Sequence, residues 1–404
     1  MGCDYRISEP RRISPFGKWC LHSYYTVNPW APDGTGRILY GAADLEKGTA
    51  AVCIGTESGE ELDCLGESEY SPSFYHTGFW QTWAPDSKTV YCQGGSNAVP
   101  KIRRICIADG REETMPGDME GLSPAGEPIL SGLIGMLYAA GYKDGNYDLS
   151  QAPVPFGQRD RHGLFSFSFS DRSAVLKLSV QEILETHPHR DLLLKEEKEL
   201  KGRLGQQERL TLMCYCVRCS PDGQKCLFYF GNHCVDRRRG EPRISYVYAA
   251  GRDLSDYHMV LDLSGSRRGV HWSWHPDGRH LIGYGPDPQE TGKICLALAA
   301  EDGSEYRKIS SHASGGHPSV SPMDENLIVT DEYFGRDGRI VLIDMRSGRE
   351  IAAERFNRAC TDVPLGRNAR LVDFHPVFRP DGRQILFNMM PEREAGVYLM
   401  DIET

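Results

Sequence analysis

The sequence predicts an all-β fold, a seven-bladed β-propeller formed by residues 1–404 as a single domain. A strand, a Pro-Asp-Gly-like turn and a second apolar strand recur seven times along the chain. The copies lie mostly about 40 to 60 residues apart, which leaves room for one four-stranded sheet each. The copies, of which the third is the weakest, are NPWAPDGTGRILYGA, QTWAPDSKTVYCQ, EGLSPAGEPILSG, CVRCSPDGQKCLFYF, WSWHPDGRHLIGYG, PSVSPMDENLIVTD and PVFRPDGRQILFN.

The turn in each copy favours a tight reversal of the chain. Proline presets φ, aspartate bonds its own backbone, and glycine accepts a positive φ. The last copy has room for about three strands, so we expect residues 4–13 to supply another strand and close the ring. The turn prolines are Pro32, Pro85, Pro124, Pro221, Pro276, Pro322 and Pro380.

The interval between Pro124 and Pro221 is longer than the others. Its segment HGLFSFSFSDRSAVLKLS predicts the outer strands of blade 3. The following VQEILETHPHRDLLLKEEKELKGRLGQQ is charged and rich in helix formers, so we expect a helical insertion between blades 3 and 4, at about residues 179–207.

Composition limits the classes of function. The net charge of −10 argues against a nucleic-acid partner, which needs a basic surplus. The chain has no apolar run of membrane-spanning length and no apolar signal region at its start, so we expect no membrane partner. Its 13 scattered cysteines are then interpreted as mostly reduced thiols of a cytoplasmic protein.

One register of the repeat carries metal-ligating side chains. The positions five residues before the turn prolines are apolar in blades 1 to 3, but in blades 4 to 7 they are Cys216, His271, His317 and His375. A lone histidine there would be a core residue. Four ligand types in register are expected to face one another across the central channel. Three imidazoles and a thiolate suit tetrahedral Zn²⁺, whereas Mn²⁺ prefers more oxygen ligands. We therefore expect a structural divalent metal, with Zn²⁺ favoured and Mn²⁺ as the alternative, and Asp373 as an outer partner of His375.

Candidate catalytic residues occur nearer the starts of the inner strands. His22 lies ten residues and His76 nine residues before the turn proline of its blade, so both should lie near one mouth of the channel, with Tyr24, Tyr25 and Tyr75 nearby. Candidates from neighbouring loops are Tyr142, His162, His233, Arg237, Arg238 and Arg239.

These residue types suit β-elimination on a uronic acid. Histidine and tyrosine transfer protons, and arginine neutralises a carboxylate, which makes the adjacent C5 proton acidic. His76, His22, His233 and Tyr142 are thus the catalytic candidates, while Arg237–Arg239 and His162 are candidates for substrate binding. An exposed arginine run is commonly only solvated. A hydrolase with paired carboxylates remains an alternative, although no such pair stands out by register.

The chain resembles the seven-bladed propeller polysaccharide lyases of the ulvan-lyase type and, more distantly, oligogalacturonate lyase. The resemblance implies lyase action on glucuronate- or iduronate-containing glycans, a catalytic role for His76 and Tyr142, carboxylate binding by the blade 4 arginines, and the channel metal. The second catalytic histidine of the family is missing from VYCQGGSNAVPKI, where Gln93 or Asn97 stands nearby. The segments that carry the resemblance are YHTGFWQTWAPDSKTVYC, HGLFSFSFSDRSAVLKLSVQEIL, CLFYFGNHCVDRRRGEPR, GVHWSWHPDGRHLIGY, GGHPSVSPMDENLIVTDEYF and RLVDFHPVFRPDGRQILFN.

The sequence thus predicts a lyase that acts on acidic oligosaccharides. Two alternatives stay open. One is a glycoside hydrolase on the same scaffold, like a related propeller family that removes rhamnose from glucuronate with one histidine, a part that His22 would play. The other is a non-catalytic carbohydrate-binding propeller.

Overall fold

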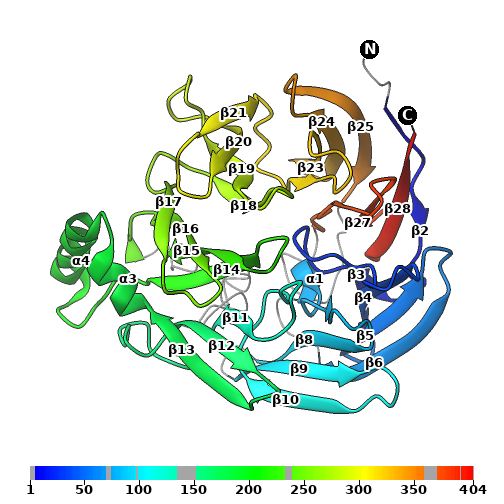
Figure 1. The fold of residues 1–404 in the computed structure, drawn as a ribbon, viewed down its shortest axis with the longest axis horizontal. Coiled ribbons are helices and arrows are strands. Elements are labelled where there is room, and N and C mark those ends of the chain that lie inside the picture. Colours follow the sequence, from blue (N-terminus) through cyan, green and yellow to red (C-terminus); the bar gives the residue numbers. More distant parts are fainter. Residues whose placement is uncertain are drawn as a thin grey trace.

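The computed structural model describes residues 5–69, 74–96, 99–133, 152–232, 239–358, 371–391 and 393–403. Seven sheets surround a central axis (Figure 1), which confirms the seven-bladed propeller. Blades 1 and 2 follow the predicted order, from the innermost to the outermost strand. Their strands are β3 (Trp19–Leu21), β4 (Arg37–Asp44), β5 (Thr49–Thr56) and β6 (Glu61–Glu69), then β7 (Thr82–Trp83), β8 (Thr89–Gly95), β9 (Pro100–Cys106) and β10 (Glu112–Pro116). The short helix α1 (Phe74–Thr77) connects the two blades.

Blade 3 has three strands among the described residues, and blades 4 to 6 have four each. The strands of blade 3 are β11 (Ile129–Gly132), β12 (Gly163–Ser168) and β13 (Ser173–Ser179). Blade 4 contains β14 (Met213–Cys219), β15 (Lys225–Gly231), β16 (Ser245–Gly251) and β17 (His258–Asp262). Blade 5 contains β18 (Val270–Trp274), β19 (His280–Pro286), β20 (Ile294–Ala300) and β21 (Arg307–Ser310), and blade 6 contains β22 (Ser319–Val320), β23 (Leu327–Phe334), β24 (Asp337–Asp344) and β25 (Arg349–Asn357).

Blade 7 joins the two ends of the chain. Its strands β26 (Val377–Phe378), β27 (Gln384–Met389) and β28 (Gly396–Glu403) are completed by β1 (Arg6–Ile7) and β2 (Arg11–Arg12), which both pair antiparallel with β28. Figure 1 shows β2, in dark blue, beside β28, in red. The expected closure by residues 4–13 is therefore confirmed, and it covers a sheet edge that would otherwise be exposed.

The predicted helical insertion is also present. Helices α3 (Val180–Thr186) and α4 (Arg190–Leu204) project from the rim beside blades 3 and 4 (Figure 1). Ser179 begins α3 with a capping box, since its side chain accepts from the Glu182 backbone while the Glu182 carboxylate accepts from the Ser179 backbone. The apolar residues of both helices belong to one hydrophobic cluster with residues of blades 3 and 4, among them Leu178, Phe230 and Tyr246.

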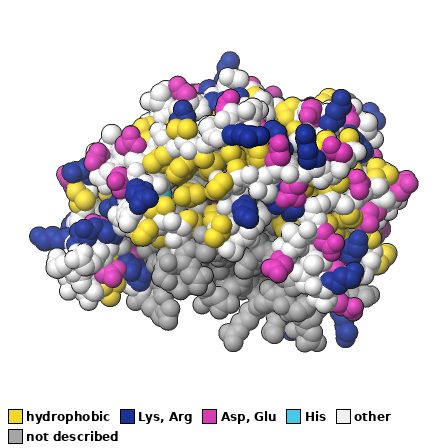
Figure 2. All heavy atoms as spheres, turned by 90° about the horizontal axis from the view of Figure 1, so that it is seen from below, with side chains coloured by type: hydrophobic (Ala, Val, Ile, Leu, Met, Phe, Trp, Pro, Cys, Tyr) yellow, Lys and Arg dark blue, Asp and Glu magenta, His cyan; other side chains and the backbone are white. Residues whose placement is uncertain are grey.

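The turn chemistry explains the repeat. The glycine of the Pro-Asp-Gly turn has a positive φ, for example 64° at Gly278 and 71° at Gly382, a conformation that glycine adopts without a steric penalty. The middle strands are apolar on both faces because each sheet packs between two others. In β15, every residue from Cys226 to Gly231 is buried. Over the face seen in Figure 2, basic and acidic side chains are interspersed.

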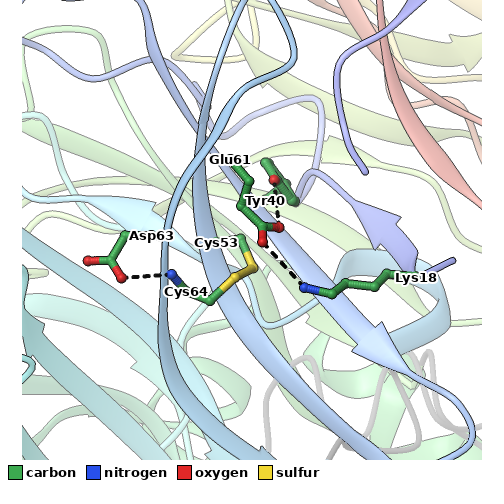
Figure 3. Close-up of a disulfide and its surroundings, with 6 residues drawn as sticks. All are labelled: Lys18, Tyr40, Cys53, Glu61, Asp63 and Cys64. Atoms are coloured by element: carbon green, nitrogen blue, oxygen red, sulfur yellow. Dashed lines mark hydrogen bonds and ion pairs between the residues drawn. A yellow bond between two sulfur atoms is a disulfide. The ribbon is translucent and has the colours of Figure 1, made fainter. Parts of the chain in front are cut away.

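A disulfide joins two neighbouring strands of blade 1. Cys53 in β5 and Cys64 in β6 are cross-strand partners with Cα atoms 4.1 Å apart (Figure 3). The other eight described cysteines are free, in keeping with mostly reduced thiols. Because disulfides persist chiefly in oxidising compartments, the cytoplasmic location stays a prediction. Among the described residues, no helix has the length and apolarity needed to cross a membrane.

We expect the substitution Cys64→Ser to destabilise the protein measurably. The disulfide spans a sequence separation of 11 residues, and closing a loop of this size contributes about 3 kcal/mol in the chain-entropy description. Urea unfolding with and without a thiol reductant checks this expectation. The reductant should lower the midpoint of the wild-type protein and leave that of the variant unchanged. Equal midpoints for oxidised and reduced wild-type protein would contradict a stabilising cross-link.

Candidate functional site

Three of the four predicted metal ligands meet in the channel. His271 lies on β18, whereas His317 and His375 immediately precede the inner strands β22 and β26. The ring centroids of His271 and His317 are 4.1 Å apart, and those of His317 and His375 are 4.3 Å apart. The repeat register brings these residues together because equivalent positions of adjacent blades face the same axis.

The backbone at this register is unusual. Trp80, Cys216, His271 and His375, all five residues before a turn proline, have positive φ values of 54°, 54°, 59° and 47°. The strand pairing shifts register at two of these positions, between Tyr215 and Arg218 and between Val270 and Ser273. A left-handed residue other than glycine costs roughly 1–2 kcal/mol, and such strain concentrates at functional sites. The residue types do not predict this backbone conformation, since none of these residues is glycine.

Asp331 holds His317. Its two carboxylate oxygens lie 3.1 and 3.0 Å from Nδ1 of His317, and they accept hydrogen bonds from the backbone N–H groups of His317 (2.6 Å) and His375 (3.2 Å). The Tyr333 hydroxyl also donates to this carboxylate. A carboxylate accepts only, so Nδ1 carries the proton and Nε2 presents its lone pair. Asp331 is fully buried on β23, and no sequence register pointed to it.

His271 has the same tautomer for a different reason. Its Nδ1 lies 3.0 Å from the carbonyl oxygen of Gly315 and 2.7 Å from that of Gly316. Carbonyl oxygens accept only, so this nitrogen also carries the proton, and Nε2 is left to accept. Two adjacent imidazoles thus present the nitrogen form that binds a cation.

His271, His317 and His375 form a histidine cluster, and His375 is its most deeply buried member. Its side chain is fully buried, and neither of its ring nitrogens has a hydrogen-bond partner. Burial lowers the pKa of His375 well below its usual value, and the neighbouring histidines lower it further. A buried nitrogen without a partner costs free energy. A divalent cation among neutral imidazoles would satisfy it, so the residues present fit a metal.

His76 and Asp373 complete a group of donors around His375. One ligand atom from each of the three residues lies within 4.8 Å of the other two. His76 is on α1, its ring centroid is 5.0 Å from that of His375, and its Nδ1 is 3.4 Å from the Asp373 carboxylate. Asp373 also pairs with Arg358 at 3.1 Å. The sequence predicted His76 as a catalytic residue and Asp373 as an outer partner of the metal, whereas the structure puts both beside His375.

Cys216 does not join a compact donor group among the described residues. It lies near Arg218, and burial raises the pKa of its thiol to about 12 despite that neighbouring charge. A thiol needs to lose its proton before it binds a metal. The four-residue ligand set with Cys216 therefore stays a prediction.

Two adjacent tyrosines line the cluster. The ring of Tyr24 is 4.6 Å from that of His375 and 5.3 Å from that of His317. The Tyr25 hydroxyl donates to the His271 carbonyl oxygen at 2.7 Å and accepts from Arg218 at 2.9 Å. Burial raises the pKa of Tyr24 well above its usual range, so its hydroxyl keeps its proton.

His22 contacts the backbone of His375. It is fully buried, its Nε2 is 2.7 Å from the carbonyl oxygen of His375, and its backbone N–H donates to Asn388. Burial lowers the pKa of His22 to about 4, so the ring is neutral. These contacts position His375 and leave His22 no access to a substrate, which corrects the expectation of a catalytic role.

Two other candidates have structural roles. His162 is buried, with its Nε2 3.1 Å from the Phe156 carbonyl oxygen, and burial lowers its pKa to about 4. Arg239 pairs with Glu241 and Glu208, each at 2.8 Å, so its guanidinium is engaged within the protein. Neither is placed to bind substrate as the sequence suggested. Tyr142, His233, Arg237 and Arg238 lie outside the described residues.

The comparisons with known proteins establish the fold. No family model matches the sequence, and no curated protein matches it. A solved structure of oligogalacturonate lyase in complex with manganese is 14% identical with a TM-score of 0.66, and the alignment covers 99% of this chain and 96% of that one. Oligogalacturonate lyase from Vibrio parahaemolyticus is 12% identical with a TM-score of 0.66, covering 98% and 96%. The finer resemblance to the ulvan-lyase type stays a prediction.

Proposed function

We propose that this propeller is a lyase that cleaves acidic, uronate-containing oligosaccharides by β-elimination, and that its channel histidines hold a divalent cation. The observation that carries the proposal is the cluster around His375, where a fully buried imidazole without hydrogen-bond partners meets three other histidines. The similar fold of oligogalacturonate lyase, solved in complex with manganese, supports the same class of reaction.

His271, His317 and His375 would hold the cation. A bound divalent cation supplies positive charge that fixes the imidazoles of separate blades in one arrangement. A set of nitrogen ligands, with or without a sulfur, favours Zn²⁺. Binding of Mn²⁺ becomes more favourable if the Asp373 carboxylate contributes an oxygen ligand. Which of the two binds follows from whether Cys216 or Asp373 completes the set.

His76 is the candidate base. Its side chain is 10% exposed, unlike the fully buried His22 and His375, and it is not one of the three histidines assigned to the cation, so it can contact a sugar. The Asp373 carboxylate, 3.4 Å from its Nδ1, orients the ring and leaves Nε2 to accept a proton. In the reaction the C5–H bond breaks and a C4=C5 double bond forms. The bond from C4 to the glycosidic oxygen then breaks as that oxygen takes up a proton, for which Tyr142 is the candidate donor.

A panel of uronate oligosaccharides tests the proposal. A lyase generates the ultraviolet absorbance of an unsaturated uronate together with new ends. New reducing ends without that absorbance would identify a glycoside hydrolase and contradict the lyase. Unchanged oligosaccharides that nevertheless bind would favour the non-catalytic carbohydrate-binding propeller.

We expect Asp331→Asn to weaken metal binding by roughly 10–100-fold, the usual effect of losing the partner that orients a ligating histidine. The amide no longer enforces the proton on Nδ1 of His317, because an amide nitrogen can donate to this position instead. Competition with a chromogenic chelator measures the affinity. Asp337→Asn, which removes an exposed carboxylate of β24, serves as the matched control. Equal affinities of the two variants would show that Asp331 does not orient the ligand.

A further inference from the structure

A cavity lies at the end of the channel where the turns of the repeat gather. It has a volume of about 640 Å³, and every one of the seven turn prolines predicted from the repeat lines it. None of the described histidines lines it. Tyr25 borders both regions, because it lines the cavity and its ring is 5.2 Å from that of His317. The volume is in the range of small-molecule sites.

One of the residues that line this cavity is a buried arginine. Arg218 is 7% exposed and lines the cavity. Its Nη1 donates to the Tyr25 hydroxyl and to the Trp272 carbonyl oxygen. No carboxylate of the described residues forms an ion pair with this guanidinium, although other buried arginines, such as Arg103 and Arg159, have one. Buried charges are usually paired. An anionic group of a ligand in the cavity could therefore pair with the Arg218 guanidinium.

A second buried polar group faces the same space. Glu120 is 5% exposed and lines the cavity, and its Oε1 has no hydrogen-bond partner. A buried carboxyl oxygen without a partner at a cavity wall can accept a hydrogen bond from a ligand hydroxyl.

The walls are apolar and aromatic. Trp83, Trp274 and Phe378 line the cavity together with the rings of the turn prolines. The indole nitrogens of the two tryptophans already donate to backbone carbonyl oxygens, of Pro29 at 2.8 Å and of Arg218 at 3.0 Å. Their ring positions are thereby fixed. Aromatic faces of this kind pack against the C–H face of a pyranose.

We propose that this cavity is a separate binding site for an acidic sugar of one or two rings, with its carboxylate on Arg218 and a hydroxyl on Glu120. A neutral sugar lacks the anionic group for Arg218, and a simple carboxylate such as acetate lacks the hydroxyls and the ring face. The site does not rest on the proposed lyase reaction, since neither Arg218 nor Glu120 takes part in the proposed elimination.

Calorimetric titration of the full chain with D-glucuronate, D-glucose and acetate tests the site. We expect glucuronate to bind at least about tenfold more tightly than either control, as loss of one charge-assisted contact implies. Equal binding of glucuronate and glucose would overturn the proposal. This comparison uses the unmodified protein and does not depend on how any variant folds.

Variants then locate the binding site. Arg218→Met and Glu120→Leu should each weaken glucuronate binding about tenfold or more, whereas His258→Asn, at an exposed position of blade 4 outside the cavity lining, should not. A circular dichroism spectrum and melting curve identify any variant that fails to fold. A crystal soaked in glucuronate provides the second readout, with density expected against Arg218. Unchanged binding in a folded Arg218→Met variant, or density at the histidines alone, would overturn the proposal, and neither result depends on the outcome of the lyase assay.

Discussion

Substitution of His76 by asparagine is expected to lower kcat for uronate elimination by roughly 10²–10⁴-fold, the usual contribution of a positioned general base. The side chain lies at the accessible edge of the cluster, with its Nδ1 beside the Asp373 carboxylate. Asparagine keeps a polar group of similar size but cannot accept a proton at neutral pH. Initial rates of ultraviolet absorbance on a uronate oligosaccharide measure the effect.

Two controls make this result specific. His258→Asn replaces an exposed histidine of blade 4, whose contacts are to backbone carbonyl oxygens, and it should keep the wild-type rate. His76→Asn should also keep the wild-type melting curve, because a base is needed for the reaction and not for the fold. A rate for His76→Asn within a few-fold of the wild type would remove His76 from the reaction.

The substitution His317→Ala should abolish stoichiometric metal binding. His317 stands between His271 and His375, so its loss removes the middle donor and also leaves the buried Asp331 carboxylate without its imidazole partner. The affinity should fall by more than the roughly 10–100-fold expected for an outer partner. Elemental analysis after dialysis measures the metal, and the melting temperature should fall because binding energy contributes to folding.

A chelator separates these two effects. Treatment of the wild-type protein should lower its melting temperature, whereas treatment of His317→Ala should change nothing further. If the wild-type protein carries no metal, or if the variant retains the wild-type amount, the histidine cluster is not a metal site.

The fourth ligand distinguishes two arrangements. The repeat register predicts Cys216, whereas the group of mutually close donors contains Asp373. Cys216→Ser should release the metal if sulfur is a ligand, and Asp373→Asn should release it if the carboxylate is. The first outcome favours Zn²⁺ and the second allows Mn²⁺.

The architecture was predictable because its signals are local. A Pro-Asp-Gly turn acts within a few residues, and its sevenfold recurrence specified the blades, the inner strands and the direction of the channel side chains. The same register therefore identified His271, His317 and His375. The capping box at Ser179 is similarly local, and the insertion was placed correctly.

The features that sequence analysis missed depend on distant contacts. Asp331 matters because β23 brings its carboxylate beside two histidines of different blades. Arg239 pairs with its neighbour Glu241 and also with Glu208, 31 residues away, and the second contact is not visible in the sequence. The positive φ at His271 arises from a bulge against β19, which a residue type alone does not reveal. His22 shares a register with His76, but only packing against His375 shows that it is inaccessible.

Anomalous diffraction from crystals of the purified protein, recorded at the zinc and manganese absorption edges, would locate the cation itself. We expect one peak on the propeller axis, bonded to Nε2 of His271 and His317 and to a ring nitrogen of His375. Crystals that show no anomalous peak among these imidazoles after incubation with either ion would contradict a shared cation in the channel.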